Sequence, residues 1–139
     1  MTAINRVYAR SFTIPAGAID ENGHANNVAY VRWMQDIAVE HYASIGGIEA
    51  QGPDVTWWVR EHRIEYLLPA FEGEEIEIRT WVENVRRVRS LRKYEFVRKS
   101  DGRLLVKGET DWVFVDAKSG RPVAIPEEVA KVFSISSEE

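Results

Sequence analysis

The stretch NNVAYVRWMQDIAVEHYASIGG, residues 26–47, decides the fold that this sequence predicts. Its apolar side chains recur at intervals of three and four residues, which is the spacing of a helix with one buried face. That face comprises Tyr30, Val31, Met34, Ile37, Ala38, His41, Tyr42 and Ile45. Either Asn26 or Asn27 is a suitable N-cap, and the Gly-Gly pair at 46–47 is a suitable stop. We therefore predict one long helix whose apolar face packs against another layer.

Extended segments lie on both sides of this helix in the sequence. Apolar and β-branched patterns predict strands over 6–14, 55–67, 75–85, 90–99 and 104–116. A short amphipathic helix carrying Val129, Val132 and Phe133 is expected near the end, followed by a frayed tail over about 134–139. The order predicts an α+β fold, an antiparallel five-stranded sheet wrapped around one long helix. We expect a single domain over residues 1–139.

The composition argues against several classes of protein and of site. The 18 Lys and Arg against 22 Asp and Glu give a net charge of −4, which disfavours a nucleic-acid partner. Without cysteine there is no disulfide and no cysteine nucleophile. His24, His41 and His62 are too scattered for a metal site. No secretory signal and no apolar run of ~18 residues is found, so we expect a cytoplasmic protein without a membrane partner.

The predicted sheet has one face covered by the helix and a second face that is only partly covered. The sequence contains five Trp, and the alternation over 75–85 places Trp81 on the outward side. Large outward aromatic residues are typical of surfaces that bury themselves against a partner. We therefore expect copies of this chain to associate through the second face of the sheet.

The segment DENGHANNVAY, residues 20–30, gathers a carboxylate, a histidine, three amides and a glycine just before the predicted helix start. The first N–H groups of a helix have no intrahelical acceptor, and that end of the helix favours negative charge. A thioester carbonyl resting there would have its developing oxyanion stabilised. A carboxylate a few residues upstream can attack the carbonyl carbon or take a proton from water. Asp20 is therefore a candidate catalytic residue, with an Asx turn as the structural alternative.

A family resemblance rests on the same segment. The motif Asp20-x-x-Gly23-His24-x-Asn26-Asn27-x-x-Tyr30-x-x-Trp33 resembles the signature of the 4-hydroxybenzoyl-CoA thioesterase family. The part from Asn22 onward is also similar to acyl-ACP thioesterases of the same fold. The resemblance continues in RIEYLLPA (63–70), GEEI (73–76) and GRPVAIP (120–126), in the family's order. It thus covers most of the chain.

The resemblance implies a hotdog fold, assembled as dimers with two active sites between subunits or as tetramers. The sequence has no Walker loop, no dinucleotide fingerprint and no GxSxG elbow, so we expect hydrolysis without a cofactor, with coenzyme A as part of the substrate. In the family an acidic residue at the place of Asp20 is nucleophile or general base, and the backbone N–H at or next to Asn27 polarises the thioester carbonyl. Many members carry an Asp-x-Asp pair here, whereas this chain has Ala18-Ile19-Asp20 and keeps only the second.

The neighbouring polar residues have two interpretations each. His24 either holds the loop or acts as a proton shuttle or substrate contact, because histidine titrates near neutral pH. Asn26 and Asn27 favour capping, although their side chains can also orient water, substrate or Asp20. Tyr30 and Trp33 are expected to be packing residues. The catalytic candidates are therefore Asp20, His24 and Asn27, with Asn26 as a substrate-binding candidate.

The segment RRVRSLRK, residues 86–93, contains five cations on a predicted strand–turn–strand connection. A solvated turn is the ordinary interpretation of such a run. The alternative is a clamp for the phosphates of coenzyme A, because arginine forks suit polyanions, and the family uses basic residues of this hairpin for the nucleotide. On that interpretation the substrate-binding residues are Arg86, Arg87, Arg89 and Ser90.

The leading hypothesis is hydrolysis of an acyl-CoA or acyl-ACP thioester. An acyl-thioester hydratase or dehydratase of the same fold is one alternative, but it usually pairs a histidine with an acid on the long helix. Glu40 and His41 are adjacent there, and neighbouring helical residues point in different directions. A non-catalytic acyl-CoA-binding module is the second alternative, and it predicts binding without turnover.

Overall fold

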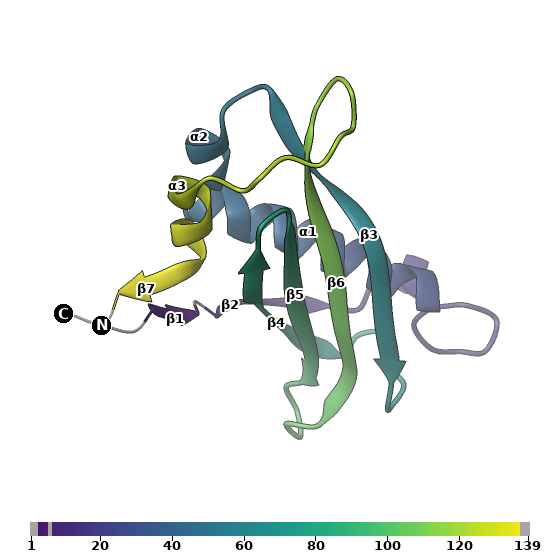
Figure 1. Cartoon of the computed structure of the whole chain (residues 1–139). Coiled ribbons are helices and arrows are strands. Elements are labelled where there is room, and N and C mark those ends of the chain that lie inside the picture. Colours follow the sequence, from purple (N-terminus) through teal and green to yellow (C-terminus); the bar gives the residue numbers. More distant parts are fainter. Residues whose placement is uncertain (1–2, 6, 137–139) are drawn as a thin grey trace.

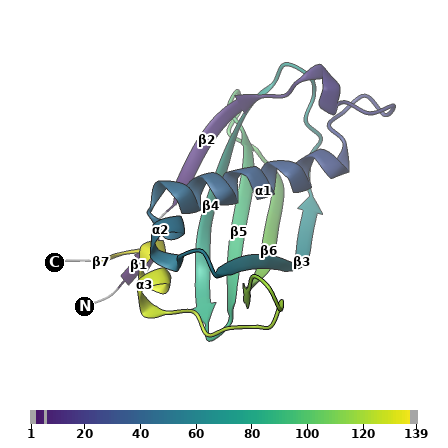
Figure 2. The ribbon, with the colours of Figure 1, turned by 90° about the horizontal axis from the view of Figure 1, so that it is seen from above.

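The computed structural model describes residues 3–5 and 7–136 of the chain. One antiparallel sheet in the order β2-β4-β5-β6-β3 carries a long helix, α1, across one face (Figures 1 and 2). The elements are β2 Tyr8–Thr13, α1 Asn27–Ser44, β3 Val55–Tyr66, β4 Glu75–Arg86, β5 Arg89–Arg98 and β6 Leu104–Asp116. The predicted α+β architecture and all five predicted sheet strands are therefore confirmed.

The helix α1 begins and ends where the sequence places its caps. The side chain of Asn26 accepts a hydrogen bond of 2.7 Å from the N–H of Val28, which identifies Asn26 as the N-cap. Past the helix, Gly46 has φ +83°, the left-handed conformation that glycine adopts without strain. Five side chains of α1 are fully buried against the sheet: Tyr30, Met34, Ile37, Ala38 and His41.

The core lies between α1 and the inner face of the sheet. In β4 the inward residues are Ile76, Ile78, Thr80 and Val82, as the alternation predicts. At the centre, a Cβ added to Gly108 of β6 would come within 2.9 Å of the Met34 sulfur. The helix therefore approaches β6 closely here, and a side chain larger than that of glycine would require the Met34 side chain to shift.

Short elements gather at the C-terminal end of α1 (Figure 2). They are α2 Gly47–Gln51, α3 Glu127–Ala130, the 3-10 turn η2 Lys131–Phe133, and a two-stranded sheet of β1 Ala3–Asn5 with β7 Ser134–Ser136. The expected short helix is present, whereas α2 and the small sheet were not predicted. The tail expected to fray over 134–139 instead pairs as β7 through Ser136, and 137–139 lie outside the described residues. The strand expected over 6–14 is shorter, and residue 6 also lies outside the described part.

The outer face of the sheet carries cross-strand ion pairs rather than an apolar patch. Arg89 contacts Asp111 at 2.7 Å and Lys93 contacts Glu109 at 4.0 Å. The large exposed apolar side chains lie mainly on β3, α1, α2 and the loop after β3: Val28, Val39, Ile48, Trp58, Val59, Tyr66, Leu67 and Phe71. The exposed apolar residues of the edge strand β3 thus offer one apolar contact surface.

Candidate active site

The Asp20 segment forms a tight hairpin between the 3-10 turn η1 (Ala16–Ala18) and the start of α1. Asp20 donates its N–H to the carbonyl of His24 at 3.1 Å, and its carbonyl accepts from Gly23 at 3.0 Å. Gly23 has φ +84°, so the turn requires a glycine there. The expected loop is therefore an ordered structure that fixes where the Asp20 side chain begins.

The carboxylate of Asp20 has one oxygen engaged in the loop. Its Oδ1 accepts from the backbone N–H of Asn22 at 2.9 Å, which is the Asx turn considered above. Within the described residues, neither oxygen forms an ion pair with a cation, and the residue is half-buried. The turn orients the carboxylate and leaves Oδ2 available to a substrate or a water.

The first turn of α1 provides the donor that thioester chemistry requires. The cap uses the N–H of Val28, and the N–H of Ala29 donates to the Asn26 carbonyl at 3.0 Å. None of the hydrogen bonds among the described residues uses the N–H of Asn27, the first residue of the helix. Asn27 is exposed, so its N–H is accessible to a carbonyl oxygen arriving at the positive end of the helix.

His24 contacts its own loop. Its Nδ1 lies 3.3 Å from the carbonyl oxygen of Ala25, and since a carbonyl only accepts, Nδ1 carries the proton. In the neutral ring Nε2 is then an acceptor. The loop-holding role of His24 is therefore observed, and its predicted role in proton transfer stays a prediction.

Aromatic side chains pack together beneath the N-terminal end of α1. Tyr30 contacts Trp33 edge to face at 5.2 Å between ring centroids and Tyr66 at 5.6 Å, and it also packs on Phe96. Burial raises the pKa of Tyr30 to about 12. The hydroxyl of Tyr66 donates to the carbonyl of Asn27 at 3.3 Å, which ties the end of β3 to the start of α1. The expected packing role of Tyr30 and Trp33 is confirmed.

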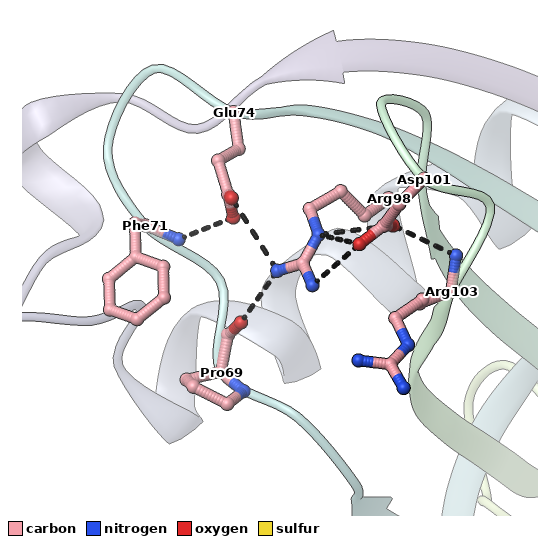
Figure 3. Close-up of polar contacts among 6 residues, drawn as sticks. All are labelled: Pro69, Phe71, Glu74, Arg98, Asp101 and Arg103. Carbon is pink, nitrogen blue, oxygen red and sulfur yellow. Dashed lines mark hydrogen bonds and ion pairs between the residues drawn. The ribbon is translucent and has the colours of Figure 1, made fainter.

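Arg98, which the sequence analysis did not identify, holds the loop between β3 and β4. Arg98, at the end of β5, contacts both carboxylate oxygens of Asp101, Glu74 at 3.5 Å and the Pro69 carbonyl at 3.4 Å (Figure 3). Glu74 in turn accepts from the N–H of Phe71 at 2.9 Å. Hydrogen bonding from Arg98 is the main cause that lowers the pKa of Asp101. We call this set of contacts the Arg98 brace.

The brace reaches the candidate site through the backbone. Ala70, inside the braced loop, accepts a hydrogen bond of 2.8 Å from the N–H of Ala25. Ile14 exchanges hydrogen bonds of 2.9 Å with Glu74 and Gly73 on the same loop. The two chain segments that enter and leave the Asp20 hairpin are therefore both attached to the loop that Arg98 holds.

The predicted coenzyme A clamp lies at the opposite end of the sheet. Arg86, Arg87 and Arg89 are exposed at the β4–β5 turn, and Arg87 has φ +29°. The other end of β4 pairs with β2, which leads into the Asp20 hairpin. The twelve residues of β4 span about 36 Å. Within one chain the structure therefore does not bring these arginines to Asp20.

Ser90 does not lie on the same face as the neighbouring Arg89, because successive strand residues point to opposite faces of the sheet. It is 3 % exposed on the inner face, where it lines a cavity together with Arg92. Arg92 is also 3 % exposed, and its Nη1 donates to His41 Nδ1 at 2.9 Å and to Thr80 at 3.1 Å. Period-two alternation from Ser90 would have identified Arg92 as an inward cation.

The helix residues considered for hydratase chemistry have different partners. Glu40 accepts from the Tyr8 hydroxyl at 2.9 Å and from Arg10 at 2.8 Å on β2. His41 is buried toward β5, where it meets Arg92. The expected divergence of the two side chains is confirmed, and they do not form an acid–base pair aimed at one point.

The described residues provide neither a metal site nor a membrane-spanning helix. They contain no cluster of three or more His, Asp or Glu side chains arranged to hold a metal ion. They also contain no helix that is long and apolar enough to cross a membrane.

Comparison with known proteins gives a family and a set of similar folds. Residues 14–133 match the model of the thioesterase-like superfamily. Among curated proteins, none matches this sequence. A 1,4-dihydroxy-2-naphthoyl-CoA thioesterase from Synechocystis has a TM-score of 0.81 at 14 % identity, over 92 % of this chain and 96 % of that chain.

Two further structures are similar over most of this chain. A Staphylococcus aureus protein solved in complex with CoA has a TM-score of 0.81 at 18 % identity, over 95 % of this chain and 84 % of that chain. A 12:0-ACP thioesterase from Umbellularia californica has a TM-score of 0.80 at 21 % identity, over 88 % of this chain and 48 % of that chain. These likenesses show that the fold is the hotdog fold.

Proposed function

Because the chain belongs to the thioesterase-like superfamily, we propose that it hydrolyses an acyl-CoA or acyl-ACP thioester with Asp20 as the working carboxylate. The observation that carries the proposal is the juxtaposition of a fixed carboxylate and a helix start. Asp20 lies on the ordered hairpin that leads into α1, and the N–H of Asn27, the first residue of α1, is an unused donor among the described residues. Similar folds that bind or cleave CoA and ACP thioesters support the substrate class.

The reaction adds water across the C–S bond. The thioester oxygen rests on the N–H of Asn27, which stabilises the negative charge that develops there. Oδ2 of Asp20 either removes a proton from the attacking water or attacks the carbonyl carbon itself. When Asp20 acts as the base, the C–S bond of the water adduct breaks and the thiolate takes the proton from Asp20, giving the free acid and the thiol. When Asp20 acts as the nucleophile, the thiolate leaves an acyl–Asp20 anhydride, and water then hydrolyses this anhydride to the free acid and supplies the proton of the thiol. In the neutral ring of His24, Nε2 carries no proton and can accept one. His24 therefore relays protons at the hairpin.

A second copy of the chain completes the site. The sheet order ends at β3, and β3 carries exposed Trp58, Val59 and Tyr66. Antiparallel pairing of two β3 strands about a twofold axis sets the end of one beside the start of the other. Tyr66 ties the end of β3 to Asn27, while the β4–β5 hairpin lies at the end of the sheet where β3 starts. A homodimer thus brings the arginines of one copy toward the Asp20 of the other.

In this dimer, Asp20 of one copy and the β4–β5 arginines of the other can bind opposite ends of one substrate. Coenzyme A carries three phosphates at its nucleotide end and the thioester at its other end, so one ligand needs an anion site distant from the catalytic carboxylate. Arg86, Arg87 and Arg89 supply cations suited to those phosphates. We assign them to the nucleotide of a substrate held by the other copy's Asp20, with Asn26 beside the thioester.

The test is thiol release from a panel of thioesters of CoA, with aliphatic and aromatic acyl groups, and from matching acyl-ACP. Turnover on at least one substrate, and no hydration of the corresponding enoyl thioester, is the expected result. Hydration without thiol release would instead support the hydratase alternative. Tight CoA binding with no turnover of any thioester would identify a binding module and overturn the proposal.

A further inference from the structure

A cavity of about 290 Å³ lies between the C-terminal half of α1, α2, β3 and the inner face of the sheet. Its wall is largely apolar and includes Ala38, Val82, Trp57, Trp112 and Phe133. Val39 and Ile48, about half exposed, lie at its rim. The volume is at the lower end of the range for small-molecule sites, ~300–1000 Å³, and suits one ring or a short chain.

Arg92 is a buried cation in the wall of this cavity. Within the described part of the chain no Asp or Glu forms an ion pair with it, and none lines the cavity. Its neighbours are His41, Thr80 and, at 6.0 Å, the face of the Phe133 ring. Burial lowers the pKa of Arg92 to about 10, so the group remains charged at neutral pH. A buried charge of this kind is unfavourable until an opposite charge joins it.

The donors of Arg92 are only partly used. Its hydrogen bonds to the described residues all come from Nη1, whereas a guanidinium has five N–H donors. The indole N–H groups of Trp57 and Trp112 are also buried there, each near a tyrosine hydroxyl but without the geometry of a hydrogen bond to any described residue. The guanidinium of Arg92 therefore brings unused N–H donors and one full positive charge to the wall of the cavity.

We propose that this cavity binds the carboxylate of a small apolar acid, with Arg92 as its anchor. A carboxylate supplies the missing negative charge and accepts two N–H bonds from one guanidinium. The apolar body of the acid fits against Phe133 and the tryptophans. The cavity is distinct from the Asp20 hairpin of the same chain, because Ala38 lies eleven residues along α1 from Asn27, about 16 Å.

Two sources of such a carboxylate are compatible with this geometry. One is a free acid, such as the product of hydrolysis. The other is a second carboxylate at the far end of the acyl group of a thioester. This second source rests on the proposed function and on the β3-paired dimer, in which the cavity of one copy faces the Asp20 hairpin of the other.

The first arm of the test measures binding of free acids. Purified protein is titrated with benzoate and hexanoate, and with benzyl alcohol and hexanol as uncharged analogues, by following tryptophan fluorescence. We expect the ratio of acid to alcohol affinity to fall at least tenfold in Arg92→Gln and to be partly retained in Arg92→Lys. Arg79→Gln, on the outer face of β4, is the matched control and should keep the wild-type ratio. Arg92→Met, with circular dichroism, provides a second variant should Arg92→Gln fold poorly.

The second arm compares hydrolysis of adipyl-CoA with that of hexanoyl-CoA. If the acyl group is the source, the ratio of their kcat/KM values favours adipyl-CoA in the wild type and falls at least tenfold in Arg92→Gln. An effect in the first arm alone assigns the cavity to a free acid. If the wild type hydrolyses no thioester, the proposed function is wrong, but the binding of free acids measured in the first arm still tests the proposal for Arg92. No dependence on Arg92 in either arm would overturn the proposal.

Discussion

The two carboxylate oxygens of Asp20 have different surroundings, and this difference matters for its chemistry. Oδ1 accepts from Asn22 and holds the turn, so the side chain cannot rotate freely. A carboxylate that is already oriented needs less reorganisation when a substrate arrives. The Asx turn, which the sequence presents as the alternative to catalysis, therefore becomes a part of the proposed catalytic arrangement.

The arginines of the β4–β5 turn give a prediction about substrate parts. The double variant Arg86→Gln/Arg87→Gln should raise the KM for an acyl-CoA about tenfold or more, because each lost phosphate contact weakens the charge-assisted binding. The same variant should leave the KM of the acyl-N-acetylcysteamine thioester, which lacks the nucleotide, within about twofold. Steady-state kinetics on both substrates checks this. Equal changes for the two thioesters would remove these residues from nucleotide binding.

Tyr30 gives a prediction about alkaline pH. Its pKa is raised to about 12 from an ordinary value of 10 by burial, so the folded state resists ionisation that the unfolded state accepts. The stabilisation is present below pH 10 and is lost as the pH rises toward 12. Between pH 8 and pH 11 the wild type should lose about 1.4 kcal/mol more stability than Tyr30→Phe. Denaturant unfolding at pH 8 and pH 11 measures the difference, and parallel losses in both proteins would contradict it.

The helices and strands that depend on local sequence patterns could be predicted from the sequence. The period of α1, its Asn26 cap and the alternation of β4 follow from neighbours within a few residues, and all were found. The run 86–93 was treated as one basic cluster, but strand alternation sends Ser90 and Arg92 inward and Arg89 outward. The cavity and the Arg98 brace join residues far apart in the sequence, and such contacts have no local pattern to reveal them.

The Arg98 brace predicts an effect on catalysis from outside the site. Arg98→Ala should lower kcat about tenfold with a smaller change in KM, because the loop that positions the Asp20 hairpin loses the hydrogen bonds from Arg98 Nη1 to the Pro69 carbonyl and to Glu74. Arg98→Lys should restore little, since an ammonium lacks the planar fork. Arg103→Ala is the control: Arg103 reaches Asp101 through its backbone N–H, which the substitution retains. A variant Arg98→Ala with normal kcat would show that the brace does not position the site.

The proposed hydrolysis of acyl-CoA involves two copies of the chain. Candidate catalytic and nucleotide-binding residues occupy opposite ends of one sheet, and the exposed apolar residues of β3 provide a surface for pairing. The sequence predicts association through the outer face, and this stays a prediction. The positions of Trp81 and of the charged residues relative to each other depend on strand register, which local patterns do not give. The ion pairs on that face became visible only with the register known.

Breaking the β3 surface should separate the copies. Val59→Glu adds a charge at an apolar position of the edge strand, and light scattering after gel filtration should then show the mass of a monomer, near 16.0 kDa, where the wild type shows a multiple. Hydrolysis of acyl-CoA should fall at least tenfold in parallel. Val7→Glu, at a more exposed valine outside β3, should change neither quantity. A monomeric wild type with full activity would contradict the shared site.

The central claim is that the carboxylate of Asp20 performs the hydrolysis. The most direct measurement is kcat of Asp20→Asn on the best acyl-CoA of the panel, with Glu21→Gln as the control, since Glu21 is the adjacent exposed carboxylate. The amide keeps the size and the oxygen that accepts from Asn22 but removes the base. We predict that Asp20→Asn lowers kcat by about 10²–10⁴-fold at unchanged melting temperature, while Glu21→Gln stays within about twofold of the wild type. Full activity in Asp20→Asn would contradict the account.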